Sequence, residues 1–317
     1  MTINIIKINF AYLGFSDIVM QNNYFNSFIM VCIAGMFWSL GAPIVRFIED
    51  SENYRLAYLL YRGLSVSIVI MIFILFRERS NFLNSIKRID SWSMLGGLLL
   101  AIAMFGFIYS ITVTTVAVTM IMLALSPLIS SILGYLILDE SISKTTIINM
   151  FIVIAGILVM LTGTDETGTL IGAAYGFIVA CCYSMYTITI RHDPEIPKLL
   201  TPAIGGILCA SIALLIIVLT DSSVLMPIIN ISLSVINGMV VAVGLILFSF
   251  GAKYLPTGEL VLLSLIEVIG GIFWVWLPFI GINETPSLST LAGGSIILIA
   301  IINQGLFTKK NHAMLAP

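Results

Sequence analysis

The chain has 317 residues, of which 59% are hydrophobic and 9% charged, and its mean hydropathy is +1.11. Soluble domains carry about 25% charged residues, so this composition excludes a soluble globular protein and predicts one that spans a membrane several times. The formal net charge of -2 says little, because the distribution of charge matters more than its sum in a membrane protein, but no basic patch indicates nucleic-acid binding.

The first 25 residues contain Lys7 but no uninterrupted apolar core followed by small residues, which is the pattern of a cleaved signal peptide. We therefore expect residues 1–25 to form a cytoplasmic tail. The four cysteines lie in apolar segments and, with the two histidines, show no zinc-like spacing. We expect these cysteines to be packing residues, and we predict neither a metal nor another cofactor.

Ten apolar segments follow in chain order, each long enough to cross a bilayer. The connections between them are short, which leaves no room for a soluble domain. The sequence therefore predicts an all-α membrane protein with ten transmembrane helices. The predicted spans are 26–47, 54–76, 92–111, 114–137, 145–163, 168–190, 199–220, 228–251, 256–280 and 287–307.

The basic residues predict the orientation, because short cytoplasmic loops are enriched in Lys and Arg. With the N-terminus inside, eleven basic residues fall on the cytoplasmic side and only Arg46 and Arg55 fall outside, while Arg62 lies within the second helix. This bias predicts that both termini are cytoplasmic. The eleven residues are Lys7, Arg77, Arg79, Lys87, Arg88, Lys144, Arg191, Lys198, Lys253, Lys309 and Lys310.

The ten predicted helices form two sets of five that resemble one another, over residues 26–163 and 168–307, followed by a cytoplasmic tail over 308–317. Because five is odd, the second set must cross the membrane in the opposite sense. Inverted repeats are typical of secondary transporters, in which the two halves expose one site to alternate sides. The matched segments are Leu138–Ser143 with Ile282–Ser287, which pairs Glu140 with Glu284; Leu125–Pro127 with Ile266–Val268; and Trp38, Ser39 and Arg46 with Tyr183, Ser184 and Arg191.

One carboxylate is predicted to lie near the middle of the membrane. Glu267 is eleven residues from both Pro256 and Pro278, or about 16 Å from each end of the helix, in a hydrocarbon core about 30 Å thick. A charge at that depth costs on the order of 3 kcal/mol, so such residues usually face a bundle interior or a cavity. Glu267 shares a helix face with small residues and one aromatic, namely Ser264, Gly270, Gly271 and Trp274. The alternative is that the small residues only let another helix pack closely.

These residues resemble the drug/metabolite transporter superfamily, and specifically its EamA-type carriers, over about residues 28–307. The resemblance implies ten helices in two inverted halves, cytoplasmic termini, and transport of small organic metabolites such as amino acids, often outward across a bacterial inner membrane. Val268 stands where the family often has proline, which leaves a kink at that point in doubt. The resemblance rests on Trp38-Ser39, Arg62, Leu125-Ser126-Pro127, Asp139-Glu140, Lys253-Tyr254-Leu255-Pro256, Ile266-Glu267 and Glu284-Thr285-Pro286-Ser287.

A central cavity between the halves is the predicted substrate site. We expect Glu267 to pair with a cationic group or to take up a proton, and Arg62 to hold a substrate carboxylate through paired hydrogen bonds. For Arg62 the alternatives are snorkelling to the headgroups or a fixed ion pair with a glutamate. We also assign Trp38, Trp274, Tyr183, Ser126 and Ser264 to substrate binding, although packing or lipid contact is the alternative for the aromatic residues.

We predict hinges where a proline removes a helix hydrogen bond and where two glycines are adjacent. The alternative is an ordinary kink for the prolines and close helix packing for the glycines. We expect Glu140 and Glu284 to be helix caps or loop contacts and Glu259 to reach water. The predicted hinge or gating residues are Pro43, Pro127, Pro256, Gly270 and Gly271.

The predicted function is a secondary transporter of a small zwitterion or amine, such as an amino acid, that exports or exchanges it across the inner membrane by alternating access. A single Arg and a single Glu at depth argue against phosphorylated substrates, which need several cations. The alternatives are a proton-coupled uptake carrier for a metabolite or osmolyte and a membrane scaffold that transports nothing. The sequence shows no hydrolase constellation, which argues against an enzyme. It also shows no continuous polar lining, which argues against a channel. The predicted partners are the substrate, the lipid bilayer and a second copy of the chain in a homodimer.

Overall fold

The computed structural model describes residues 23–78, 82–162, 169–192, 198–282, 285 and 287–314. Within these ranges, eight helices are long and apolar enough to cross a membrane, and two shorter apolar helices cover Lys144–Val159 and Leu291–Asn303. An all-helical, multi-pass membrane protein is therefore confirmed. The count of ten full spans, the inverted repeat and the cytoplasmic termini stay predictions, and Glu284 and residues 1–22 lie outside the described residues.

Three of the long spans are interrupted by a short non-helical step, and two helices begin with a polar cap. Residues 23–46 are interrupted at Leu40, residues 116–138 at Ala124 and Leu125, and residues 257–276 at Leu265. Asp90 and Thr115 each accept a hydrogen bond from the backbone amide three residues later, which satisfies a donor that the first turn cannot. The helices are α2 (Gly41–Arg46), α3 (Arg55–Glu78), α4 (Phe82–Lys87), α5 (Ser91–Val113), α6 (Val116–Leu123), α7 (Ser126–Leu138), α8 (Lys144–Leu161), α9 (Thr169–His192), α10 (Leu200–Leu219), α11 (Ile228–Gly251), α12 (Thr257–Ser264), α13 (Ile266–Trp276) and α14 (Leu288–Met314).

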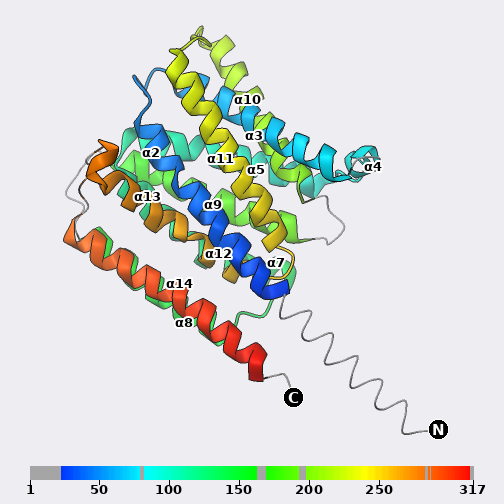
Figure 1. Cartoon of the computed structure of the whole chain (residues 1–317), viewed down its shortest axis with the longest axis vertical. Helices are drawn as coiled ribbons and strands as arrows, with labels where there is room; N and C mark the ends of the chain where they lie inside the picture. Colours follow the sequence, from blue (N-terminus) through cyan, green and yellow to red (C-terminus); the bar gives the residue numbers. More distant parts are fainter. Residues whose placement is uncertain are drawn as a thin grey trace.

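The helices pack as a bundle in which neighbours in space are often distant in sequence (Figure 1). Helix α5 lies against α9 and α10, and α3 lies against α10 and α11. Helix α12 packs on α7 while α13 packs on α6, so these two interrupted spans run in opposite directions. The pair α8 and α14 pack mainly on each other at one side of the bundle (Figure 1).

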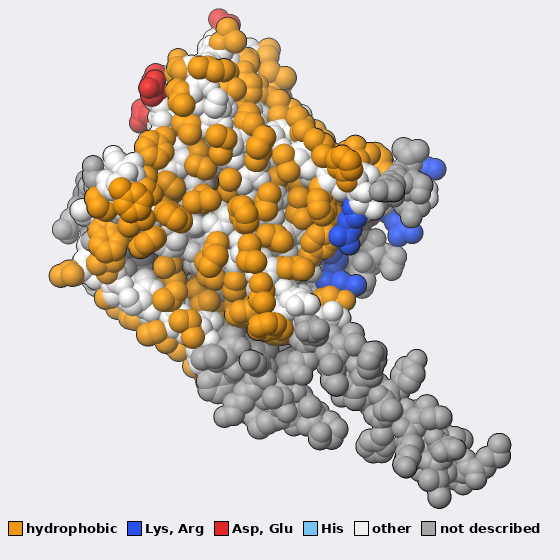
Figure 2. Space-filling model, in the orientation of Figure 1, with side chains coloured by type: hydrophobic (Ala, Val, Ile, Leu, Met, Phe, Trp, Pro, Cys, Tyr) orange, Lys and Arg blue, Asp and Glu red, His pale blue; other side chains and the backbone are white. Residues whose placement is uncertain are grey.

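Many large apolar side chains are exposed on the outer surface, which is the pattern of a protein that lies in lipid. Phe76 and Leu219, for example, are more than 70% exposed. Figure 2 shows apolar side chains over most of one face, with Lys and Arg gathered beside α4 and Asp and Glu at the upper left. The polar exceptions inside the bundle, above all Arg62, therefore stand out as candidates for function.

Candidate functional site

A cavity of about 90 Å³ lies between helices of the first and second halves of the chain. One water molecule needs about 10–15 Å³ measured in this way, so the cavity has room for several. The structure brings six of the seven predicted substrate-binding residues to its wall, and Trp274 is the exception. The lining residues are Trp38, Gly41, Arg62, Leu100, Ala103, Met104, Phe107, Leu123, Ser126, Val179, Tyr183, Val241, Leu245, Ser264, Leu265, Glu267 and Val268.

Arg62 lies in the third turn of α3, and its side chain is only 5% exposed. Two of its guanidinium nitrogens, Nε and Nη1, are buried without a hydrogen-bond acceptor in the described part of the chain. The guanidinium carbon lies 5.8 Å from the centre of the Phe107 ring, a cation–π contact. A buried charge whose N–H groups lack acceptors is costly, so an anion in this cavity would be bound favourably.

Glu267 is the second residue of α13, directly after the interruption at Leu265. Its carboxylate lines the same cavity as Arg62, yet among the described residues the structure records no ion pair between the two and no hydrogen bond to the Glu267 carboxylate. The cavity therefore carries one cationic and one anionic group, near enough to interact electrostatically but without an ion pair between them. The sequence left open a fixed ion pair for Arg62, and no such pair exists within the described ranges.

Three hydroxyl groups complete the polar part of the wall. The Oγ of Ser126 is buried and has no hydrogen-bond partner among the described residues. The Oγ of Ser264 donates to the carbonyl of Val261 at 2.8 Å, and the Tyr183 hydroxyl lies 3.5 Å from the same Oγ. The interrupted spans thus bring Ser126, from the start of α7, and Ser264, from the end of α12, to one cavity.

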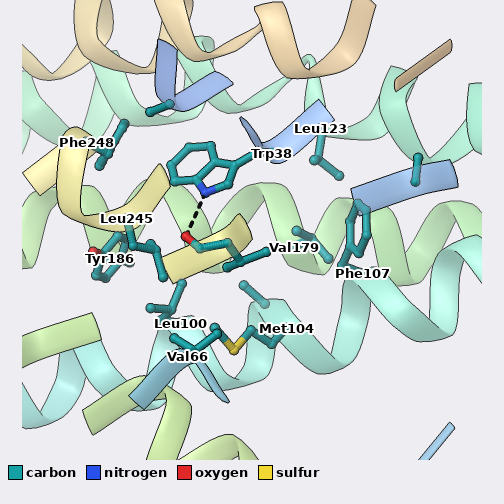
Figure 3. Packing of buried hydrophobic residues seen from close by; sticks show 14 of the residues in the cluster. Trp38, Val66, Leu100, Met104, Phe107, Leu123, Val179, Tyr186, Leu245 and Phe248 are labelled. Atoms are coloured by element: carbon teal, nitrogen blue, oxygen red, sulfur yellow. Dashed lines mark hydrogen bonds between the residues drawn. The ribbon is translucent and has the colours of Figure 1, made fainter. Parts of the chain in front are cut away.

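The remaining wall is apolar, and Trp38 is its largest member. Its indole Nε1 donates to the carbonyl of Val241 at 3.2 Å, which ties the span 23–46 to α11 (Figure 3). The indole meets the Tyr183 ring edge to face, with centroids 5.9 Å apart, and contacts Phe248 at 5.3 Å. These contacts fix the orientation of Trp38 beside the cavity. The wall that α5 contributes was not predicted, and it consists of Leu100, Ala103, Met104 and Phe107.

Trp274 is not among the residues that line the cavity. Its Nε1 donates to the Oγ of Ser39 at 2.9 Å. A methyl group added at Gly270 would lie 2.6 Å from the Cβ of the same serine, and one at Gly271 would lie 3.0 Å from the Met120 side chain. Trp274, Gly270 and Gly271 therefore pack α13 closely against neighbouring helices, as the alternative to substrate binding expects. Their assignment to substrate binding and gating stays a prediction.

The three predicted hinge prolines lie at helix starts, where a missing amide hydrogen costs little. Pro43 is the third residue of α2, Pro127 is the second residue of α7, and Pro256 directly precedes α12. The first two follow an interruption of their span. Leu265 interrupts the 257–276 span as well, although no proline is present there.

A second polar cluster, which we name the Arg191 cluster, joins the ends of four helices, α7, α9, α11 and α12. The Arg191 guanidinium pairs with Glu140, with 2.9 Å between Nε and Oε1, and it also donates to the carbonyls of Ala252 and Leu255. The other oxygen of Glu140 accepts the amide of Thr257 at 2.8 Å. Glu140 thus acts as the predicted cap and loop contact, but the role of Arg191 was missed. The signal was the predicted repeat, in which both residues are matched with residues of the other half.

Beside this cluster lies another cavity, of about 200 Å³. Glu259, which we expected to reach water, is only 7% exposed, and its Oε2 accepts the Tyr24 hydroxyl at 2.6 Å. Glu259 therefore does not face the outer surface but lines this cavity, where the Tyr24 hydroxyl binds its carboxylate. The cavity is lined by Ser131, Glu140, Ser141, Ile142, Ser143, Thr146, Pro256, Gly258 and Glu259.

Comparisons with known proteins agree with this architecture. Residues 26–162 match the EamA-like transporter family. A solved structure titled only "Crystal structure of protein" is similar in fold, with a TM-score of 0.66 and 15% identity over 90% of this chain and 98% of its own. No curated protein matches the chain. The match covers a little under half of the chain, and over residues 26–162 the sequence is similar to the EamA-like transporters, which are multi-pass membrane proteins.

Proposed function

We propose that this protein is a secondary transporter that carries a small organic metabolite through the central cavity. One observation supports this most directly: Arg62 and Glu267 line one apolar cavity inside a membrane protein and form no ion pair with each other. Ionisable groups at membrane depth are expensive and are kept where they contact a substrate or an ion. The family match adds that the chain's relatives are transporters.

The substrate class follows from the charge of the wall. A carboxylate binds at the Arg62 guanidinium, an ammonium group binds at Glu267, and the apolar remainder lies against the α5 wall. An amino acid or a similar zwitterion has this combination of groups. A phosphorylated substrate would need more cations, and Arg62 is the only basic residue among those that line the cavity.

Alternating access is the proposed mechanism, with export or exchange across the inner membrane and both termini in the cytoplasm. The antiparallel packing of the interrupted spans 116–138 and 257–276 supports it, because halves of opposite orientation can expose one site to either side in turn. Proton-coupled uptake is the alternative, in which Glu267 carries the proton. A homodimer is part of the same proposal.

The proposal is tested in two steps. A panel of amino acids and amines is first screened for thermal stabilisation of the purified protein, since a ligand that binds only the folded state raises its apparent stability. The stabilising compounds are then followed as labelled substrates in proteoliposomes that hold the wild-type chain, Glu267→Gln or Arg62→Ala. We expect saturable flux that counter-flow stimulates and that both substitutions reduce at least tenfold.

Two results would count against this function. Unaltered flux in both variants would remove the proposed site, and the absence of counter-flow would leave a scaffold rather than a carrier. A variant outside the cavity, Glu52→Gln, serves as the control, because Glu52 is 74% exposed and contacts Arg55 at 3.7 Å. Its flux should equal that of the wild type.

A further inference from the structure

The Arg191 cluster lies on the helices that build the central cavity. Helix α9 contributes Tyr183 to the cavity wall and Arg191 to the cluster, eight residues later, which is about 12 Å along the helix axis. Helix α7 begins with Ser126 in the wall, and Glu140 follows its end. The cluster therefore ties together, beyond one end of the cavity, the elements that would have to separate for a molecule to leave on that side.

The bonds of the cluster cross between the two halves of the chain. Glu140 belongs to the first half, whereas Arg191 and the acceptors Ala252 and Leu255 belong to the second. A second bond from Glu140, to the amide of Thr257, holds the start of α12 as well. Relative movement of the halves at this end requires both contacts of Glu140 to break.

Water can replace the partners of Glu140 when they separate. Breaking an ion pair in a dry interior leaves two desolvated charges, which makes such a pair a poor switch. Glu140, however, also lines the cavity of about 200 Å³ that Glu259 and several hydroxyl groups share. This cavity offers hydration to the carboxylate, so the pair can open at a lower cost than one enclosed by apolar side chains.

The equivalent residue of the other half makes a related contact at the other end of the molecule. Arg46, which the repeat matches with Arg191, donates from Nη2 to the carbonyl of Thr114 at 3.0 Å. Thr114 lies in the connection before α6, as Leu255 lies in the connection before α12. One arginine thus holds the connection before each of the two interrupted spans.

We propose that Arg191 and Glu140 form a gate that closes the central cavity at this end and must open during each transport cycle. The inference rests on the proposed function. Its physical basis is the network that joins α7, α9 and α12 beyond the cavity, next to a second cavity that can hydrate Glu140.

The gate is tested by the sided accessibility of a cysteine in the cavity, an assay that needs no substrate. Ser126→Cys is placed in the full chain, alone and with Glu140→Gln, in vesicles that expose one face or the other to a membrane-impermeant thiol reagent. Mass spectrometry of the peptide measures labelling at position 126 separately from the native cysteines. We expect Glu140→Gln to raise the labelling rate from the Arg191 side on the order of tenfold, because a charge-assisted bond is lost while the contact with the Thr257 amide is kept.

Three comparisons make the outcome decisive. Glu52→Gln breaks an exposed ion pair and should leave labelling unchanged from both faces. Arg191→Lys keeps the charge but loses the fork of donors, so it should fall between wild type and Glu140→Gln, and it decides the question if Glu140→Gln does not fold. Unchanged labelling from the Arg191 side, or an equal rise from both faces, would overturn the gate. Loss of flux in the transport assay with a normal labelling response would instead count only against the proposed substrate site.

Discussion

The central cavity and the Arg191 cluster contain the same two chemical groups in different settings. In the cluster, the Arg191 guanidinium is bound by Glu140 and by two backbone carbonyls. In the cavity, Arg62 has two buried N–H groups without acceptors among the described residues, and it is not paired with Glu267. The difference separates a pair that holds the structure together from charges that are available to a ligand.

Helix geometry explains the difference. Arg191 lies at the end of α9, close to the end of α11, where the last backbone carbonyls have no partner within their own helix and can accept its hydrogen bonds. Arg62 lies inside the bundle, against the middle of α5, where the carbonyls are already used and the side chains are apolar. A guanidinium is therefore fully bonded at a helix end, whereas two nitrogens of the one inside the bundle lack acceptors in the described part of the chain.

The largest expected effect on stability comes from removing Arg191, whose charge is fully hydrogen-bonded in the cluster. Arg191→Ala deletes the ion pair and both carbonyl contacts and leaves the Glu140 carboxylate, only 18% exposed, without its cation. We expect the folded state to lose about 3 kcal/mol, measured as the fall in the thermal unfolding midpoint in detergent. Glu52→Gln, at an exposed pair, should leave the midpoint within experimental error. Equal midpoints for Arg191→Ala and wild type would mean that the cluster does not stabilise the fold.

Removing the Arg62 charge, by contrast, should not lower the stability of the fold. Arg62→Met keeps the length of the side chain and removes a buried charge that has no acceptors for two of its nitrogens. We expect an unchanged or raised unfolding midpoint and a loss of about 2 kcal/mol in binding of any carboxylate ligand found in the screen. A lower midpoint together with unchanged affinity would show that Arg62 supports the fold rather than a ligand.

The sequence located the apolar spans and the charges at membrane depth, because both depend only on composition and on distance along a helix. Glu267 and Arg62 were chosen for their depth and for the family resemblance, and they line one cavity. Trp274 was chosen because it shares a helix face with Glu267. That reasoning ignored the distance along the axis, about 10 Å for seven residues, which places Trp274 next to Ser39 instead.

Contacts between distant segments were beyond sequence reasoning. Arg191 was used to predict the orientation and the repeat but not a contact, since nothing local shows that residues 51 positions before it and 61 to 64 positions after it bind its side chain. The wall from α5 was missed for a related reason. Leu100, Met104 and Phe107 are apolar whether they face lipid or a cavity, so only the packed structure distinguishes the two.

A substitution behind Trp38 sharpens the description of the cavity wall. A methyl group at Gly244 would lie 2.2 Å from the indole Nε1, so Gly244→Ala must displace the ring and break its bond to the Val241 carbonyl. We expect a loss of about 1.5 kcal/mol in stability, together with weaker ligand binding, because the aromatic wall moves. Gly294→Ala is the matched control, since nothing lies within 4 Å of the added methyl. It should be neutral or slightly stabilising. A Gly244→Ala protein as stable as this control would show that the wall near Trp38 adapts.

The smallest expected effect on stability concerns Asp90, a carboxylate that lies outside the membrane-spanning segments and accepts hydrogen bonds from Ser93. Partial burial disfavours the charged form of Asp90, but hydrogen bonds from the Ser93 hydroxyl at 2.6 Å and the Ser93 amide at 2.8 Å outweigh it and lower its pKa. A carboxyl whose pKa is lower in the folded state stabilises that state above its unfolded pKa, and this contribution is lost as the pH falls through the folded value. Asp90→Ala should therefore cost about 1 kcal/mol at neutral pH and less in acid. Asp90→Asn keeps the acceptor without the charge, so its unfolding midpoint should vary less with pH than that of the wild type. The same pH dependence in both proteins would assign the acid sensitivity of the fold to another group and would leave Asp90 as a neutral cap.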